Sequence, residues 1–402
     1  MFAPFLKKRI RNIYLSLIIG LTVFFLYNNS SSSQSLVVET EITTTESTNS
    51  ESQISIQYYP EKEIRHLRYK LDSLLKRINK RHDFHGAILV AKKGNILYNN
   101  QVGYADFKKK TPLNEKSVFQ LASVSKQFTA AAIMLLNERN QIKLSDTVTA
   151  YFPRFPYKQV TIRSLLNHTA GLPNYFWVAE HKWRSKEAPT NSEMMALLES
   201  SNVQRYFKPG RNFDYSNTGY FVLASIVEKV SGTSFSSFLK SNIFEPLQMK
   251  YSYVYNPKND SIHENQLDGY RLYKGWRHLK INNTVNDAIV GDKNVYTTIE
   301  DLYKWTLGLN SGKLISQESL DLMYSEGETV YGRKVPYGFG FRINTEGQKI
   351  IYHHGKWNGF RTGLTKYLED DLVVIVLEHT SYSAMTSLNK KIKKIIAENL
   401  EV

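Results

Sequence analysis

The chain contains no cysteine among its 402 residues. This absence excludes structural disulfides, zinc sites built on thiolates and attachment to a membrane through a lipid-modified cysteine. A stable fold must therefore rely on an apolar core. The content of hydrophobic residues, 42%, is sufficient for one large domain or two ordinary ones.

The N-terminal segment also lacks two features: an apolar stretch long enough to span a membrane easily, and a recognisable cleavage site for signal peptidase. The basic cluster from Lys7 to Arg11 precedes an uncharged, mostly apolar run from Ile13 to Tyr27, which is shorter than the roughly 20 residues of a comfortable span. No Ala-x-Ala-like cleavage site follows it. We therefore interpret residues 1–27 as a signal peptide or a signal anchor. Both alternatives predict an exported chain, and the missing cleavage site favours an anchor in the cell envelope.

Core-forming residues are scarce in the segment that follows. Residues 28–60 consist mainly of Ser, Thr, Glu and Asn, the composition of a flexible linker. Residues 61–402 then form the predicted folded domain, which opens with an amphipathic helix over Glu61–Lys80. The net charge of +15 is shared between the leader and a lysine-rich C-terminal helix. Because no basic and aromatic motif accompanies the charge, we expect no nucleic-acid partner.

Strand signals are few in the middle of the domain and gather at both of its ends. Two apolar runs around a Gly-Asn turn predict a β-hairpin near residues 84–100. Further strands are expected between 337 and 380, and a mostly helical insert between about 136 and 290. This order predicts an α+β fold in which one antiparallel sheet is assembled from both chain ends, is flanked by helices and carries an inserted helical subdomain.

Three short motifs follow one another along this domain. They are Ser123-Val-Ser-Lys126, Tyr215-Ser-Asn217 and His353-His-Gly355. The first pattern also occurs at Ser73, Ser237 and Ser387, so order and context select Ser123 as the candidate nucleophile.

The first two motifs together offer the chemistry of acyl transfer. A serine hydroxyl needs a base within hydrogen-bond reach, and a lysine three residues on lies on the same helix face. Lys126 must lose its proton to act as that base, which requires its pKa to fall by about 3 units. Tyr215 is the candidate second acid/base group, and Asn217 offers a donor and an acceptor to a substrate amide. The alternative is that Ser123 caps a helix and Asn217 caps the next one.

The third motif is expected at the end of a strand. There Gly355 would let a substrate backbone approach, and His353 could donate to Tyr215 or to a substrate carboxylate. No third ligand stands at a recognisable spacing, so we predict no metal site. His82 and His85 are expected at the surface.

As a set, these motifs resemble the serine β-lactamase and penicillin-binding superfamily, and within it the branch of class C β-lactamases and D-alanyl-D-alanine carboxypeptidases. Further matching segments are 164–172, 207–210, 215–220 and 355–360. The resemblance implies an acyl-enzyme on Ser123, with Lys126 as base, Tyr215 in proton transfer and Asn217 on the substrate amide. It also implies an oxyanion hole formed by the backbone N–H groups of Ser123 and Lys356, and no cofactor.

Two positions depart from the pattern of this branch. Class C β-lactamases carry lysine where this chain has His353, which favours a carboxypeptidase or an esterase. His354 stands where threonine or serine commonly binds the substrate carboxylate, so Arg361 or Lys356 is a candidate for that contact. The open alternatives are a peptidase acting on peptidoglycan stem peptides, an esterase or D-amino-acid amidase, a β-lactamase as a weaker candidate, and a non-catalytic envelope binding module.

Overall fold

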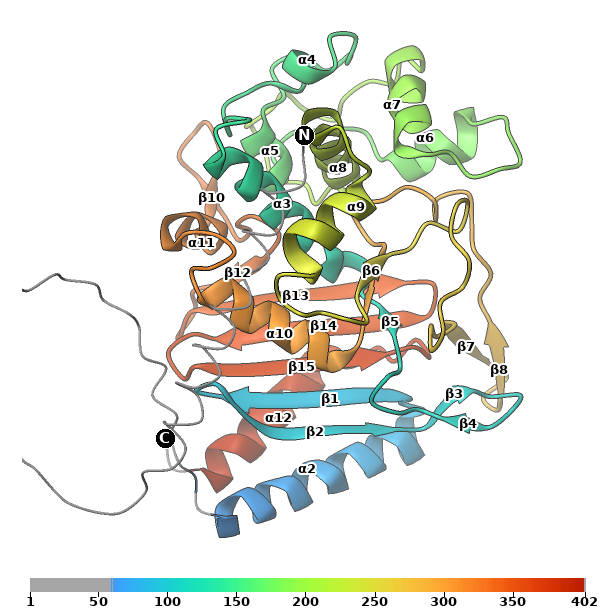
Figure 1. Cartoon of the computed structure of the whole chain (residues 1–402), viewed down its shortest axis with the longest axis vertical. Helices are drawn as coiled ribbons and strands as arrows, with labels where there is room; N and C mark the ends of the chain where they lie inside the picture. Colours follow the sequence, from blue (N-terminus) through green and yellow to red (C-terminus); the bar gives the residue numbers. More distant parts are fainter. Residues whose placement is uncertain (1–58, 60, 401–402) are drawn as a thin grey trace, which may run out of the picture. The chain divides into compact units, whose positions relative to one another are not determined.

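The computed structural model describes Tyr59 and residues 61–400, and within this part the fold is α+β (Figure 1). Its centre is a six-stranded antiparallel sheet in the order β12-β13-β14-β15-β1-β2. The chain ends supply all six strands, which confirms the sheet predicted from the sequence. They are β1 (Gly86–Lys92), β2 (Asn95–Val102), β12 (Arg342–Asn344), β13 (Ile350–Trp357), β14 (Phe360–Tyr367) and β15 (Leu372–Glu378).

Helices cover both faces of the sheet at its inner strands β1 and β15, which are buried along their whole length. Along β1, Leu89 and Ala91 pack into the large core shared with the helical region, whereas Ile88 and Val90 pack against α2 (Glu61–His82) and α12 (Met385–Asn399). This alternation is the period of two that a strand imposes on its side chains. A strand buried on both faces reads as a continuous apolar run.

The remaining helices lie mainly above the sheet in Figure 1, on the side away from α2. They are η1 (Ala122–Ser125), α3 (Lys126–Glu138), α4 (Val148–Tyr151), α5 (Ile162–Leu166), α6 (Tyr175–Lys182), α7 (Asn191–Ser200), α8 (Asn217–Ser231), α9 (Phe235–Leu239), η2 (Lys240–Phe244), α10 (Ile299–Asn310) and α11 (Gln317–Met323). Helix α3 is almost wholly buried and leads from η1 into this region.

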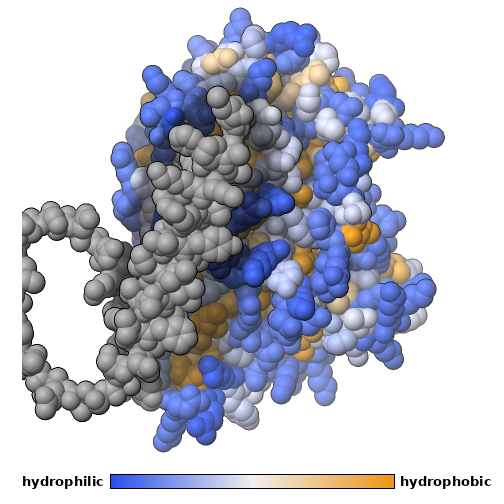
Figure 2. All heavy atoms as spheres, viewed as in Figure 1, coloured by the Kyte–Doolittle hydropathy of each residue, from blue (hydrophilic) through white to orange (hydrophobic). Residues whose placement is uncertain are grey.

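Nine short strands lie outside the six-stranded sheet in the described residues, and three of them, β6, β7 and β8, fall within the region 136–290 expected to be mostly helical. The nine strands form a three-stranded sheet β5-β9-β6 and three small hairpins. Their bounds are β3 (Tyr104–Asp106), β4 (Thr111–Pro112), β5 (Phe119–Gln120), β6 (Tyr253–Val254), β7 (Tyr270–Tyr273), β8 (Arg277–Lys280), β9 (Val295–Thr297), β10 (Gly327–Glu328) and β11 (Lys334–Val335). On the face shown in Figure 2, hydrophilic residues predominate among the coloured atoms.

Two boundaries differ from the expectation. The strands expected from residue 337 onward begin only with β12 at Arg342, since Tyr337 takes part in a single isolated bridge with Arg342. The His353-His-Gly motif lies inside β13 and not at its end, since pairing with β14 continues to Trp357. The segment 1–27, interpreted as a leader, and nearly all of the predicted linker lie outside the described residues. Among the helices that the structure describes, none has the length and apolar character needed to cross a membrane.

Candidate active site

Ser123 lies in η1, at the point where the chain passes from β5 into the buried helix α3. The residue before it, Ala122, is fully buried and has a φ of 49°, which is costly for any residue with a Cβ. Neither η1 nor α3 has a side-chain capping bond, so Ser123 does not act as a helix cap. A strained backbone thus precedes the candidate nucleophile.

The backbone just before Ser123 packs closely against β13 at Gly355. A Cβ built on Gly355 would lie 2.3 Å from the Leu121 carbonyl oxygen and 2.2 Å from Thr362 Oγ1. The Thr362 hydroxyl donates to the same carbonyl at 2.6 Å. The glycine therefore lets β13 approach the chain just before Ser123, and not a substrate backbone as the sequence suggested.

Lys126 is fully buried, and its ammonium has three hydrogen-bond acceptors. Nζ donates to Asn217 Oδ1 and to the Asp292 carbonyl, both at 2.8 Å, and to Ser123 Oγ at 3.3 Å. Burial lowers the pKa of Lys126 to about 8, with Arg342 adding to the shift and the Asp292 carboxylate opposing it. The structure therefore brings Ser123, Lys126 and Asn217 together as predicted.

Tyr215 lies beside the same ammonium, with its ring centroid 5.1 Å from Lys126 Nζ. Its hydroxyl is buried and has no hydrogen-bond partner of normal geometry. Burial raises the pKa of Tyr215, and the nearby Ser123 hydroxyl opposes this shift without a well-formed bond. Of the two groups, Lys126 thus loses its proton first. The helix cap expected at Asn217 is instead Ser216, whose Oγ accepts from the Gly219 N–H at 3.3 Å.

His353 faces the site but does not bond to Tyr215. Nδ1 donates to the His354 carbonyl at 2.9 Å, so Nε2 accepts from the Tyr337 hydroxyl, also at 2.9 Å. Burial and the charge of Lys126 hold the pKa of His353 well below its usual range. A neutral ring whose two nitrogens are both occupied fixes β13 to Tyr337 and leaves no donor for a substrate carboxylate.

The three other predicted side chains of this region do not face Ser123. Side chains alternate along a strand, and Gly363, the register partner of His354, would with a Cβ meet His354 and Met385 of α12. His354 therefore lies on the α12 face of the sheet. By the same alternation Lys356 and its partner Arg361 lie on that face. The backbone N–H of Lys356 is the only part of these residues left for the predicted site.

Four functional candidates were missed in the sequence. His168 is buried, its Nδ1 accepts from the Ser216 N–H at 3.1 Å, and its ring centroid lies 4.3 Å from that of Tyr215. It lies inside the matching segment 164–172, which was noted without a role. The guanidinium of Arg342 lies 5.0 Å from the centre of the Tyr215 ring.

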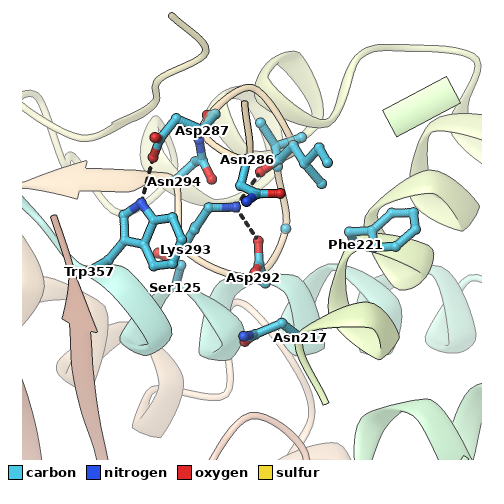
Figure 3. Close-up of polar contacts among 12 residues, drawn as sticks. Ser125, Asn217, Phe221, Asn286, Asp287, Asp292, Lys293, Asn294 and Trp357 are labelled. Atoms are coloured by element: carbon cyan, nitrogen blue, oxygen red, sulfur yellow. Dashed lines mark hydrogen bonds and ion pairs between the residues drawn. The ribbon is translucent and has the colours of Figure 1, made fainter. Parts of the chain in front are cut away.

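The other two are Asp292 and Lys293, in a buried loop beside the site (Figure 3). Lys293 Nζ donates to the Asp292 carboxylate at 3.1 Å and to the Tyr175 hydroxyl at 2.6 Å. Asp287, on the same loop, accepts from the Trp357 indole N–H and so ties the loop to the end of β13. No short motif signals these contacts, because Tyr175 and Trp357 lie 118 and 70 positions from their partners in the loop.

One His and Asp cluster stands apart from this site within residues 61–400. Asp83 accepts from Nε2 of His85 at 3.1 Å and from Nε2 of His278 at 2.8 Å. His85 is buried, so its expected surface position is wrong. Because His85 Nδ1 accepts from the Tyr104 N–H at 3.0 Å, Nε2 must carry the proton and has no lone pair for a metal ion. The donor set therefore does not fit a metal.

The chain is similar to known proteins in both sequence and fold. The sequence model of the Beta-lactamase family matches residues 71–396. "Penicillin-binding protein 4*" of Bacillus subtilis (strain 168) is 35% identical over 326 residues, which cover 78% of this chain and 72% of that protein. A penicillin-binding protein of Bacillus halodurans has a similar structure, with a TM-score of 0.70, 24% identity and coverage of 79% of this chain and 98% of that chain.

The octameric penicillin-binding protein homologue of Pyrococcus abyssi is similar in both sequence and fold, with a TM-score of 0.69, 27% identity and coverage of 81% and 77% of the two chains. The chain therefore belongs to the Beta-lactamase family, within the superfamily of serine β-lactamases and penicillin-binding proteins.

Proposed function

We propose that the protein is an exported serine hydrolase that forms an acyl-enzyme on Ser123 and removes the terminal D-residue from peptides ending in a free carboxylate. The observation that carries the proposal is the buried Lys126, which touches the Ser123 hydroxyl and has a pKa of about 8. At pH 7 roughly one molecule in ten then holds a neutral lysine, a usable fraction of general base.

Acylation follows from these contacts. Neutral Lys126 takes the proton of Ser123 Oγ, and Oγ forms a bond with the substrate carbonyl carbon. The N–H groups of Ser123 and Lys356 stabilise the resulting oxyanion, each worth about 100 to 1,000-fold in rate. Tyr215, protonated because its pKa is high, passes a proton to the leaving amine and regains one from Lys126. Water then attacks the acyl-enzyme by the same proton route in reverse.

Asn217 positions the substrate in this scheme. Its Oδ1 already accepts from Lys126 at 2.8 Å, so its N–H₂ group is the part of the amide left for a substrate. A substrate amide carbonyl is the acceptor that this donor fits. The single amide therefore fixes Lys126 and orients the peptide.

The position of Arg342 supports the proposal that the substrate carries a free carboxylate. Its guanidinium is half-buried beside Tyr215, and its positive charge lowers the pKa of Lys126. Arg342 is in register with Tyr352, on the face of the sheet that also carries His354, but its strand β12 forms the edge of the sheet and its guanidinium reaches Tyr215. We therefore assign the carboxylate contact to Arg342. The name of the Bacillus subtilis relative supports binding of penicillin-like substrates.

The test compares three substrates: a stem-peptide mimic ending in D-alanyl-D-alanine, the same peptide with an amidated C-terminus, and a short-chain nitrophenyl ester. We expect release of D-alanine from the free acid, at least tenfold slower turnover of the amidated peptide, and loss of this preference in Arg342→Gln. Faster turnover of the ester than of either peptide would instead favour an esterase, the second function that this site supports.

A further inference from the structure

A second cavity lies on the face of the sheet opposite Ser123. It has a volume of about 910 Å³ and is bounded by β12, β13 and β14 on one side and by α12 on the other. His354 lines it, whereas His353, the next residue along the strand, packs on the Ser123 side. The volume falls within the range of about 300–1,000 Å³ for small-molecule sites.

Three buried polar atoms without partners belong to residues that line this one cavity. They are the side-chain oxygens of Gln348 and Asn389 and Nε2 of His354. Asn389 is only 5% exposed, its amide N–H₂ donates to Thr365 Oγ1 at 2.9 Å, and its side-chain oxygen has no partner. A buried polar atom without a partner costs roughly 1–3 kcal/mol. Two acceptors and an imidazole left open around one cavity indicate a ligand rich in hydroxyl or N–H donors.

The charge of the lining points to an anion. Its basic side chains outnumber its one carboxylate, Glu346. Lys393 and Lys394 already pair with Asp370 and Glu398. Lys390 makes no ion pair or hydrogen bond with any residue that the structure describes. Tyr352 and Ile350 supply an apolar and aromatic surface beside these polar groups.

We propose that this cavity is a binding site for an anionic sugar. Ring hydroxyls would satisfy the oxygens of Gln348 and Asn389, the anionic group would pair with Lys390, and the C–H face of the ring would lie on Tyr352. The proposal is independent of the acyl-transfer function, because no group of the cavity belongs to the Ser123 site except Arg342, which borders both.

The experiment measures binding of three probes to the full-length protein by calorimetry and ligand-observed NMR. The probes are N-acetylmuramic acid, N-acetylglucosamine 1-phosphate and N-acetylglucosamine. The third lacks the anion, and the first two distinguish a carboxylate from a phosphate. We expect at least one charged sugar to bind about tenfold or more tighter than the neutral one, as a charge-assisted hydrogen bond predicts.

Variants locate the site. Lys390→Ala and Gln348→Ala should each weaken binding roughly five- to tenfold. Lys391→Ala is the matched control, since it is an exposed neighbour on α12 outside the lining, and should change affinity less than twofold. Ser123→Ala and protein acylated by benzylpenicillin should bind as well as the unmodified chain. Thermal melting establishes that each variant is folded.

Four results would overturn the proposal. They are no binding of any probe, equal binding of inorganic phosphate, equal loss in Lys391→Ala, and loss of sugar binding on acylation of Ser123. The last result would place the sugar in the substrate cleft.

Discussion

Lys126 and Asp292 interact in two ways that act on the same ammonium. The Asp292 carbonyl accepts from Lys126 Nζ at 2.8 Å, while the Asp292 carboxylate, held by Lys293 and Tyr175, raises the pKa of Lys126 against the effect of burial. The loop that carries Asp292 therefore positions the proposed base and sets how easily it loses its proton.

Removing that carboxylate should make Lys126 a stronger proton donor. In Asp292→Asn the carbonyl contact remains, but the negative charge is lost and the charge of Lys293 is left uncompensated. The pH at which the acylation rate rises, near 8 in the unmodified enzyme, should therefore be lower in Asp292→Asn. Asp287→Asn, on the same loop, is the control, because its carboxylate contacts Trp357 and Asn358 instead. If the rate rises at the same pH or at a higher pH in Asp292→Asn, the Asp292 carboxylate does not raise the pKa of Lys126.

The proposed base itself gives a direct test. Only neutral lysine can accept the Ser123 proton, so acylation in the unmodified enzyme should rise with pH up to about 8 and then level off. Lys126→Arg keeps a positive charge that is not lost at any working pH. Its acylation rate should fall about 100 to 10,000-fold, and Lys126→Met should fall similarly. A variant that keeps more than a tenth of the rate would exclude Lys126 as the base.

Gly355 should tolerate no side chain. In Gly355→Ala the new Cβ would overlap the Leu121 carbonyl and Thr362, which we expect to cost about 1–3 kcal/mol of unfolding free energy and to displace Ser123. Gly363→Ala is the matched control on the adjacent strand, where the nearest atoms are side-chain atoms at 3.2 and 3.3 Å. Chemical denaturation and acylation rates measure both effects. Equal losses in the two variants would contradict the explanation given for Gly355.

Because Glu378 is buried, we expect the free energy of unfolding to depend on pH. Burial raises its pKa to about 8, against hydrogen bonds from Thr380 and Tyr382. The folded state therefore holds a proton that the unfolded state releases near pH 4.5, and the stability from this group is lost as pH rises from about 4.5 to 8. Relative to Glu378→Gln, the unmodified protein should lose stability across this window, on the order of a few kcal/mol. Denaturation at pH 5 and pH 8 would show the difference, and parallel curves would contradict it.

The antiparallel sheet, its assembly from both chain ends and the grouping of Ser123, Lys126 and Asn217 could be predicted from the sequence, because apolar runs and short motifs are local signals. The sequence did not predict which side chains of β13 lie on which face of the sheet. The sequence placed the end of the strand at the His353-His-Gly motif and did not show which of His353 and His354 faces the nucleophile. In the structure the strand continues to Trp357, and the alternation of side chains places His354 on the other side. The Asp292–Lys293 pair was missed because its partners come from distant segments.

The central claim is that Ser123 is the acylated residue. Its most direct test is the intact mass of the protein after mixing with benzylpenicillin, followed from seconds to hours, with Ser123→Ala and the neighbouring Ser125→Ala as controls. Ser125 Oγ already accepts from the Val295 N–H at 3.0 Å. We predict a long-lived mass gain of one penicillin in the unmodified chain and in folded Ser125→Ala, and none in Ser123→Ala. A gain that persists in Ser123→Ala, or no labelling of the unmodified chain by either penicillin or a serine-reactive phosphonate, would contradict the account.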